Sequence, residues 1–341
     1  MSVVHHNVRQ YCAMYFIAPP SFLVEIELMN LRIGEDDSIT ECNGHDFINL
    51  IDGWYYNLEY IPHYIDHLKT IDERTFKACQ TETIAFLRKG GRRFFRTSQN
   101  IGQIDYRSSK VGTTITFRIR FHFVKEPCNV FYAVDDIPNN AVYITRNYRQ
   151  SIICATYFVK ELWRPTPIDG LLINVISYNI GNSSGGIKKE QDLKKHMKKP
   201  CISHKYLASD WVEFDGGIHF GLTSKMKPDD FQICNDAPIK QFPFAALIRC
   251  QDVAIRMVSQ HPQRPNNFIQ FSVMRVLKNT IDKMAITDTV KEFTCLNKPK
   301  SWETFPLSLD PDSKCEWHIV VVVLSIKTIF FFSLSLFHHR L

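Results

Sequence analysis

The sequence predicts a mainly β protein, built as a β-sandwich or a barrel. Hydrophobic residues make up 45% of its 341 residues and aromatic residues 13%, which is enough to bury a substantial core. Many short stretches alternate between apolar and polar residues, as strands with one buried face do. Clusters rich in turn-forming residues separate these stretches, and long helical patterns are few.

The stretch 113–123, TTITFRIRFHF, shows this alternation most clearly. One predicted face carries only apolar residues, which are Ile115, Phe117, Ile119, Phe121 and Phe123. The other face carries polar and basic residues, which are Thr116, Arg118, Arg120 and His122. Because successive side chains of a strand point to opposite faces of its sheet, we expect a half-buried strand with a basic outer face.

Further strands are predicted for seven stretches, which are 130–137, 141–148, 151–159, 170–180, 216–224, 242–250 and 267–276. The pattern of residues 71–87 has roughly helical spacing, although its second half also fits a strand, and residues 22–33 fit either structure. Residues 280–296 begin as a strand and are expected to end as a short helix.

Two segments depart from this pattern. Residues 186–200, GIKKEQDLKKHMKKP, form a lysine-rich insertion, interpreted either as a solvated surface run or as a nuclear-import or phosphate-contacting patch. Residues 319–337 are apolar apart from Lys327 and are long enough to span a bilayer. Their low complexity fits translated non-coding sequence equally well, and in either case we expect them to lie outside the fold.

Charge and cysteine content point to an intracellular protein. The formal net charge of +6 permits binding to nucleic acid or to an acidic membrane without requiring it. The ten cysteines form no CxxC pair and are scattered through apolar surroundings, so we expect reduced core cysteines. The first ten residues show no basic region followed by a long apolar run, so no secretory signal is expected.

No motif indicates catalysis. The sequence lacks GxxxxGK[ST], GxSxG and HExxH motifs, and no GxGxxG follows a predicted strand. His63 and His67 have the i, i+4 spacing of metal ligands on a helix, but no third ligand is evident, so a structural role is favoured. The sequence therefore predicts no enzyme, no metal site and no cofactor.

Four stretches, taken in order, resemble segments of the T-box DNA-binding domain. They are FKACQTETI with GGRRFF (76–95), RFHFVKEPCNVFYAVDDIP (120–138), HKYLASDWVEFDGGIHFGLTSK (204–225) and NNFIQFSVMRVLKNTIDKMAI (266–286). The resemblance covers residues 72 to 298. It implies an immunoglobulin-like, p53-like β-sandwich with a short C-terminal helix. Loops at one end of the sandwich, together with this helix, would bind double-stranded DNA. The chain departs from the family at Arg96, where the family has proline, at an insertion over 97–113, and at 289–294, which replaces the family's minor-groove helix.

The resemblance also implies roles for individual residues. Arg92 or Arg93 would read guanine in the major groove from a glycine-hinged turn. Phosphate contacts would come from Lys225 and Lys278, and Asn279 would contact either phosphate or base. On the terminal helix, Lys291 would meet phosphates and Phe293 the minor groove.

The resulting hypothesis is a nuclear, sequence-specific transcription regulator that binds double-stranded DNA, either as a monomer or as a homodimer on paired half-sites. Its domains would be an N-terminal extension (1–70), the DNA-binding domain (71–298) and a C-terminal tail (299–341). The alternative is a β-sandwich protein-interaction module whose DNA binding is lost, anchored to a membrane only if 319–337 is a genuine anchor.

Overall fold

The computed structural model describes residues 10–32, 47–56, 59–78, 94–108, 114–150, 152–159, 168–180, 210–217, 232–234, 244–249, 252–259, 266–277, 290–294, 320–321 and 330–335. Within these residues, helix is confined to α1 (Ile71–Arg74) and two 3-10 turns, η1 (Tyr64–Asp66) and η2 (Val134–Asp136). Nearly all other regular structure is β-strand, so the prediction of a mainly β protein is confirmed.

The chain divides into two compact units. The first unit comprises Met1–Tyr64, Leu68–Pro127 and Lys298–Leu341, and the second comprises Ile65–His67 and Cys128–Asn297. The boundary expected at residue 70 therefore falls inside the first unit.

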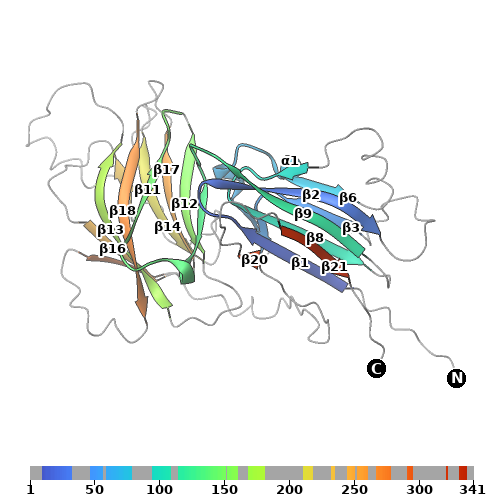
Figure 1. Cartoon of the computed structure of the whole chain (residues 1–341). Helices are drawn as coiled ribbons and strands as arrows, with labels where there is room; N and C mark the ends of the chain where they lie inside the picture. Colours follow the sequence, from blue (N-terminus) through green and yellow to red (C-terminus); the bar gives the residue numbers. More distant parts are fainter. Residues whose placement is uncertain are drawn as a thin grey trace, which may run out of the picture. The chain divides into compact units, whose positions relative to one another are not determined.

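The first unit contains two larger sheets and a hairpin (Figure 1). One sheet has the order β20-β1-β8-β3-β6, with strands Val320–Val321, Gln10–Ile17, Ile101–Ser108, Phe47–Ile51 and Thr75–Ala78. The other has the order β21-β9-β2-β7, with strands Phe330–Ser335, Thr114–Phe123, Phe22–Arg32 and Phe94–Arg96. The hairpin pairs β4 (Trp54–Tyr56) with β5 (Glu59–Ile61).

A single apolar cluster fills the first unit and draws on both of its sheets. From the first sheet come Phe16, Ile48, Leu50, Ala78, Ile104 and Tyr106, and from the second come Val24, Ile26, Leu28, Phe117 and Ile119. These residues recur at every second position of their strands, as expected when each sheet turns one face to the core. The two sheets therefore form a sandwich.

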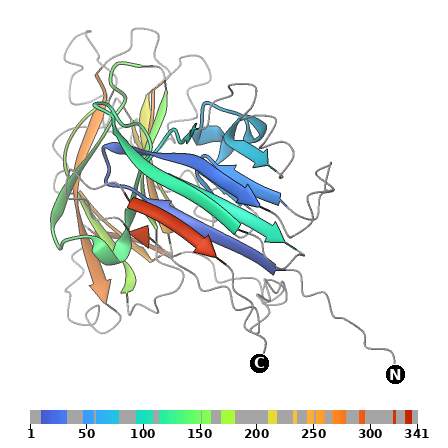
Figure 2. The same ribbon diagram turned by 45° about the vertical axis from the view of Figure 1, so that its right-hand side comes forward.

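Strands β2 and β9 are the longest pair of this sandwich, and Figure 2 shows β21 (red) running beside β9. Their antiparallel register places Ile26 opposite Ile119 and Glu25 opposite Arg120. The half-buried strand predicted over 113–123 is confirmed, and residues 22–33, left open between helix and strand, form β2. Of the helical pattern over 71–87, the described residues 71–78 form α1 over their first four positions and continue as β6.

The second unit is also built from two sheets. One has the order β10-β12-β17-β14-β15, with strands Val130–Ala133, Ile153–Val159, Asp252–Val258, Trp211–Gly217 and Gln232–Cys234. The other has the order β11-β18-β13-β16-β19, with strands Ala141–Arg146, Phe268–Leu277, Ile168–Asn179, Phe244–Arg249 and Val290–Thr294. A core cluster with residues from both sheets, such as Phe158, Ile255, Ile173 and Phe271, fills the space between them.

Two predictions about the C-terminal part are wrong. The short helix expected near residue 290 is β19, which pairs in parallel with β16. The apolar stretch 319–337 was expected outside the fold, but its described residues form β20 and β21, which pair with β1 and β9. In the part of the chain that the structure describes, no helix is long and apolar enough to cross a membrane.

Candidate functional site

The outer face of strands β2, β7 and β9 in the first unit carries a compact group of charged side chains beside an exposed aromatic ring. We call it the charged face, and it consists of Glu25, Glu27, Phe94, Arg96, Arg118, Arg120 and His122. All of these residues lie on the strand faces opposite the core, because their neighbours Ile26, Phe95 and Ile119 belong to the core or pack against it.

The strand register brings opposite charges together on this face. Glu25 of β2 lies between Arg96 of β7 and Arg120 of β9, and Glu27 lies opposite Arg118. Side chains directly across an antiparallel pair are close enough to interact, so each glutamate meets an arginine on a neighbouring strand.

The shortest ion pair on the charged face is the one between Glu25 and Arg96. The Oε2 atom of Glu25 accepts hydrogen bonds from Arg96 Nη2 at 2.7 Å and Arg96 Nε at 3.1 Å, and lies 3.0 Å from His122 Nε2. Burial alone would raise the pKa of Glu25, but the hydrogen bonds and charges of Arg96 and His122 outweigh it, and the pKa is lowered. Glu25 is therefore an ionised carboxylate at neutral pH.

The carboxylates lie beneath the cations. The Glu25 side chain is 5% exposed, whereas the side chain of Arg96 above it is 52% exposed. Arg120 donates to Glu27 Oε2 at 3.0 Å and its guanidinium lies over the ring of Phe94, 5.1 Å from the centroid. A molecule that approaches this face therefore meets guanidinium groups and the Phe94 ring before it meets a carboxylate.

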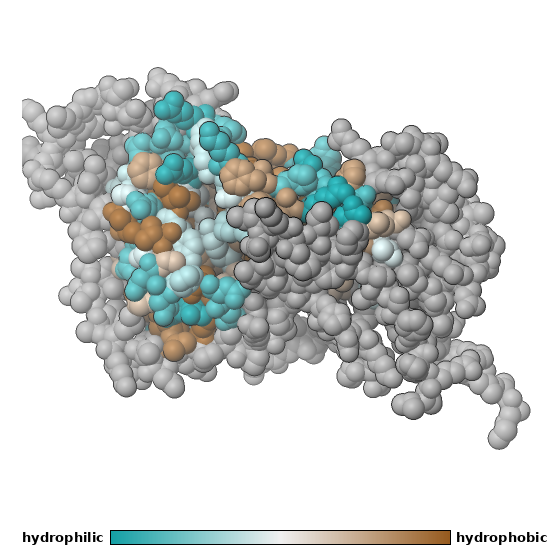
Figure 3. All heavy atoms as spheres, viewed as in Figure 1, coloured by the Kyte–Doolittle hydropathy of each residue, from teal (hydrophilic) through white to brown (hydrophobic). Residues whose placement is uncertain are grey.

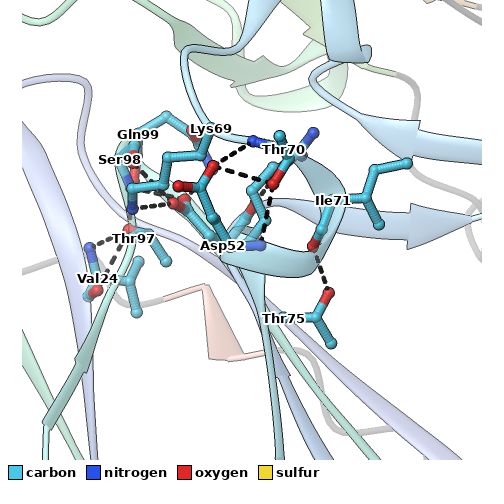
Figure 4. A network of polar contacts seen from close by, with 11 residues as sticks. Val24, Asp52, Lys69, Thr70, Ile71, Thr75, Thr97, Ser98 and Gln99 are labelled. Carbon is cyan, nitrogen blue, oxygen red and sulfur yellow. Dashed lines mark hydrogen bonds and ion pairs between the residues drawn. The ribbon is translucent and has the colours of Figure 1, made fainter.

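A buried carboxylate, Asp52, fixes the turn that follows β7 (Figure 4). It accepts hydrogen bonds from Ser98 N at 2.6 Å, Ser98 Oγ at 2.7 Å and Gln99 Nε2 at 2.7 Å, and it pairs with Lys69 at 2.7 Å. A buried carboxylate needs such donors, because desolvation without compensation is costly.

Thr97, which directly follows Arg96, ties the same turn to β2. Its backbone N donates to Val24 O at 2.9 Å, and its Oγ1 accepts from Val24 N at 2.9 Å (Figure 4). The turn is thus held by both Asp52 and Val24. Because β7 has only three residues, this anchoring positions Phe94 and Arg96 on the charged face.

The second unit contains a different charge cluster, which is buried. Arg256 of β17 donates to Asp66 Oδ2 at 2.8 Å, contacts Asp215 Oδ2, and lies 3.4 Å from Glu213 Oε1. Tyr157 donates to Asp66 Oδ2 at 2.6 Å, and burial, followed by the charge of Asp66, raises the Tyr157 pKa well above its usual value. We interpret this cluster as structural, because the Arg256 guanidinium is buried and pairs with carboxylates of its own unit.

Exposed apolar side chains of the second unit lie among polar neighbours. Val142 and Ile144 of β11 are exposed, but they stand opposite Ser272 and Gln270 of β18. Figure 3 shows hydrophobic (brown) and hydrophilic (teal) residues intermixed on the visible described surface. Single exposed apolar residues are normal on soluble domains, so this sheet face gives no argument for a binding site.

Most of the residues predicted to bind DNA lie outside the described part of the chain, namely Arg92, Arg93, Lys225, Lys278 and Asn279. Lys291 and Phe293 lie on β19, which is a strand and not the expected helix. Because five of the seven predicted residues lie outside the described chain, the structure does not test whether the set lies together. The sequence did predict the basic side chains of β9, but it gave no role to Glu25, Glu27 or Arg96. The alternation VEIEL within 22–33 contained the sign of a charged outer face that could pair with them.

The cysteine prediction is wrong for the two cysteines whose side chains the structure describes. Cys128 and Cys154 form a disulfide, with their Cα atoms 4.7 Å apart. The sequence did not indicate it, because the two residues are 26 positions apart and belong to no short motif. Disulfides persist in oxidising compartments and are rare in the cytosol and nucleus, so the expected reduced, intracellular environment does not fit.

The histidines His63 and His67 flank the turn η1 and do not share an α-helix. The ring of His63 lies beside that of Tyr64, with centroids 4.1 Å apart and the ring planes tilted by 46°. Among the residues that the structure describes, no group of three or more His, Cys, Asp or Glu side chains is placed to hold a metal ion.

Comparison with known proteins identifies a relationship that the sequence patterns had missed. Residues 2–123 match the family model of the corticotropin-releasing factor binding protein N-terminal domain, and they include the whole charged face. The chain is 30% identical over 252 residues to the corticotropin-releasing factor-binding protein of Homo sapiens, a match that covers 73% of this chain and 64% of that protein. The Xenopus laevis protein of the same name is 25% identical over 260 residues, covering 73% of this chain and 65% of its own length.

The T-box resemblance is wrong. Its four short matches are outweighed by a family model that matches 2–123 continuously and by relatives that are matched over 73% of the chain. The predictions that depended on it are therefore overturned: double-stranded DNA and paired half-sites as partners, transcription regulation, and the nucleus as location. The tail-anchored interaction module is not supported either, since the described parts of 319–337 are strands.

Two solved structures also align, the CUB1-EGF-CUB2 regions of human MASP-1/3 and of rat MASP-1. They are 10% identical and cover 78% of this chain, with TM-scores of 0.24 and 0.22. We draw no conclusion about the fold from scores this low.

Proposed function

We propose that this chain is a peptide-binding protein of the corticotropin-releasing factor-binding type. The observation that carries the proposal is the match of residues 2–123 to the N-terminal domain model of that family. Its support is the 30% identity to the human protein, whose name states that it binds corticotropin-releasing factor. Since the match spans 64% of that protein's length, the activity of the whole relative comes to this chain only as a proposal.

The proposal places the protein in an oxidising compartment, along the secretory route or outside the cell. The Cys128–Cys154 disulfide supports this location. We propose binding without catalysis, and the sequence-based expectation that the chain is no enzyme stays a prediction. A p53-like class of sandwich forms no part of the proposal, because it rested on the T-box resemblance.

Titration calorimetry would test the proposed function directly. The full chain would be produced through a secretory pathway, so that Cys128–Cys154 can form, and titrated with corticotropin-releasing factor peptide. A scrambled peptide of the same composition is the control. We expect saturable binding to the natural peptide and none to the scrambled one. Equal binding to both peptides, or binding to neither, would overturn the proposal.

A further inference from the structure

We propose that the charged face is a docking surface for a carboxylate-bearing segment of a peptide partner. The inference rests on the proposed function and deepens it, because it assigns the contact surface and the chemistry of the partner. The surface is formed by Phe94, Arg96, Arg120 and His122, which lie above the buried Glu25 and the largely covered Glu27.

The charge balance of this face favours an anionic partner. Among the named side chains of the charged face, three arginines, Arg96, Arg118 and Arg120, outnumber the two glutamates. The excess is presented outward, because the glutamate side chains are nearly buried while Arg96 is half exposed. Surface arginines are the preferred partners of carboxylates, since their planar N–H groups match carboxylate geometry.

The arginines also retain hydrogen-bonding capacity. Arg96 uses Nε and Nη2 on Glu25, and Arg120 uses Nη2 on Glu27. No residue of the described chain accepts a hydrogen bond from Arg96 Nη1 or Arg120 Nε. A peptide carboxylate can therefore be bound while both ion pairs stay in place, and Glu25 holds the Arg96 side chain ready for it.

An apolar contact lies beside these donors. Phe94 is 41% exposed, and one face of its ring is covered by the Arg120 guanidinium. Aromatic and arginine side chains together are typical of the residues that dominate binding energy at interfaces. We therefore expect the docked segment to carry an acidic side chain next to an apolar one.

The test is a cycle of two proteins and two peptides. The wild-type chain and Arg96→Gln/Arg120→Gln would each be titrated with corticotropin-releasing factor peptide and with a version in which every Asp and Glu is replaced by Asn and Gln. We expect the wild-type chain to lose about tenfold or more in affinity for the neutral peptide, as for loss of a charged contact. The double variant should bind both peptides with similar, weak affinity.

Two further variants separate binding from folding. Arg146→Gln removes an exposed arginine of the second unit and should leave both affinities unchanged. The variant Arg96→Lys keeps a positive charge beside Glu25 but loses the planar guanidinium, so a folded protein with weakened binding is expected. Circular dichroism melting would show that each variant is folded.

The outcomes distinguish the two proposals. If the wild-type chain binds neither peptide, the proposed function fails and the docking surface fails with it. If the wild-type chain binds the natural peptide and the arginine variants bind it equally well, only the docking surface is overturned. Affinity that falls with rising salt for the natural peptide, but not for the neutral one, would add support for direct charge pairing.

Discussion

Arginine meets buried carboxylate in both units of this protein, with opposite consequences. On the charged face of the first unit, Arg96 binds Glu25 while its own side chain stays 52% exposed. In the second unit, Arg256 binds Asp66, Glu213 and Asp215 while its side chain is only 8% exposed. The Arg96 guanidinium is accessible to a binding partner, whereas the Arg256 guanidinium is buried and paired within its own unit. The pairing itself therefore does not indicate function, but the exposure of the cation does.

Removing the buried guanidinium is expected to have the largest effect. Arg256→Ala leaves Asp66 and Asp215 buried without their cation, and breaking a buried ion pair typically costs about 3–5 kcal/mol. Urea unfolding of the full chain would measure this loss. The matched control is Arg256→Gln/Asp66→Asn, which removes the charges of Arg256 and Asp66 together. It should recover part of the stability that Arg256→Ala loses. A loss of less than about 1 kcal/mol in the single variant would contradict the structural role.

Asp52 lies between the two extremes, since it is buried but supports an exposed site. Asp52→Ala removes the acceptor for Ser98 and Gln99, and hydrogen bonds to a charged group contribute about 1.5–3 kcal/mol. We expect a destabilisation of about 2–3 kcal/mol by urea unfolding, together with weaker binding of corticotropin-releasing factor peptide, because the turn after β7 loses one of its two anchors.

Lys69→Met is the matched control for Asp52. It removes only the partner whose side chain is 42% exposed, and an exposed ion pair contributes less than about 1 kcal/mol. Equal losses in the two variants would mean that the turn after β7 does not depend on the buried hydrogen bonds.

Glu25 and Glu213 should contribute to the pH dependence of stability in opposite directions. The pKa of Glu25 is lowered, so the folded state holds fewer protons than the unfolded state just below the usual pKa of 4.5, and the stability that Glu25 contributes is lost on acidification. Burial raises the pKa of Glu213, and the charge of Arg256 offsets this rise only in part. Ionisation of Glu213 therefore disfavours the folded state as pH rises above 4.5.

Urea unfolding of Glu25→Gln and Glu213→Gln between pH 3 and 7 would show this contrast. Relative to wild type, Glu25→Gln should be less stable at neutral pH, with the difference shrinking as pH falls below about 4.5. Glu213→Gln should become more stable relative to wild type as pH rises above about 4.5. If the stability differences of the two variants from wild type changed with pH in the same direction, Glu25 and Glu213 would not differ as stated.

The sequence could predict whatever depended on local alternation. Period-two patterns located β9, β11, β13 and β18 to within a few residues, because each turns one face to a core and one away from it. The same reasoning missed β17, DVAIRMV, since all of its residues are buried and its only basic residue, Arg256, meets buried carboxylates. A strand covered on both faces has no alternation to detect, and β12, which is buried in the same way, was located by its apolar run instead.

What the sequence could not predict depended on contacts between distant positions. Asp66 and Arg256 are 190 residues apart, and Glu25 and Arg96 are 71 apart, so neither pair belongs to a motif. The glycine-hinged pair Arg92 and Arg93 drew attention by its local pattern. Arg96, three residues further on, is described and pairs with Glu25, but the pattern marked it only as a departure from an expected proline.

The smallest expected effect on stability is that of Arg96→Gln, and it separates the two kinds of arginine most sharply. The variant loses one half-exposed ion pair, while Arg120 and His122 remain near Glu25, so the free energy of unfolding should fall by no more than about 1 kcal/mol. Its affinity for corticotropin-releasing factor peptide should fall markedly if Arg96 receives a peptide carboxylate. Arg256→Gln should show the reverse, a large loss of stability with unchanged affinity in the protein that remains folded. Calorimetry and urea unfolding on the same preparations would measure both quantities. If Arg96→Gln destabilised the protein as much as Arg256→Gln and left its affinity unchanged, exposure would not distinguish a binding arginine from a structural one in this protein.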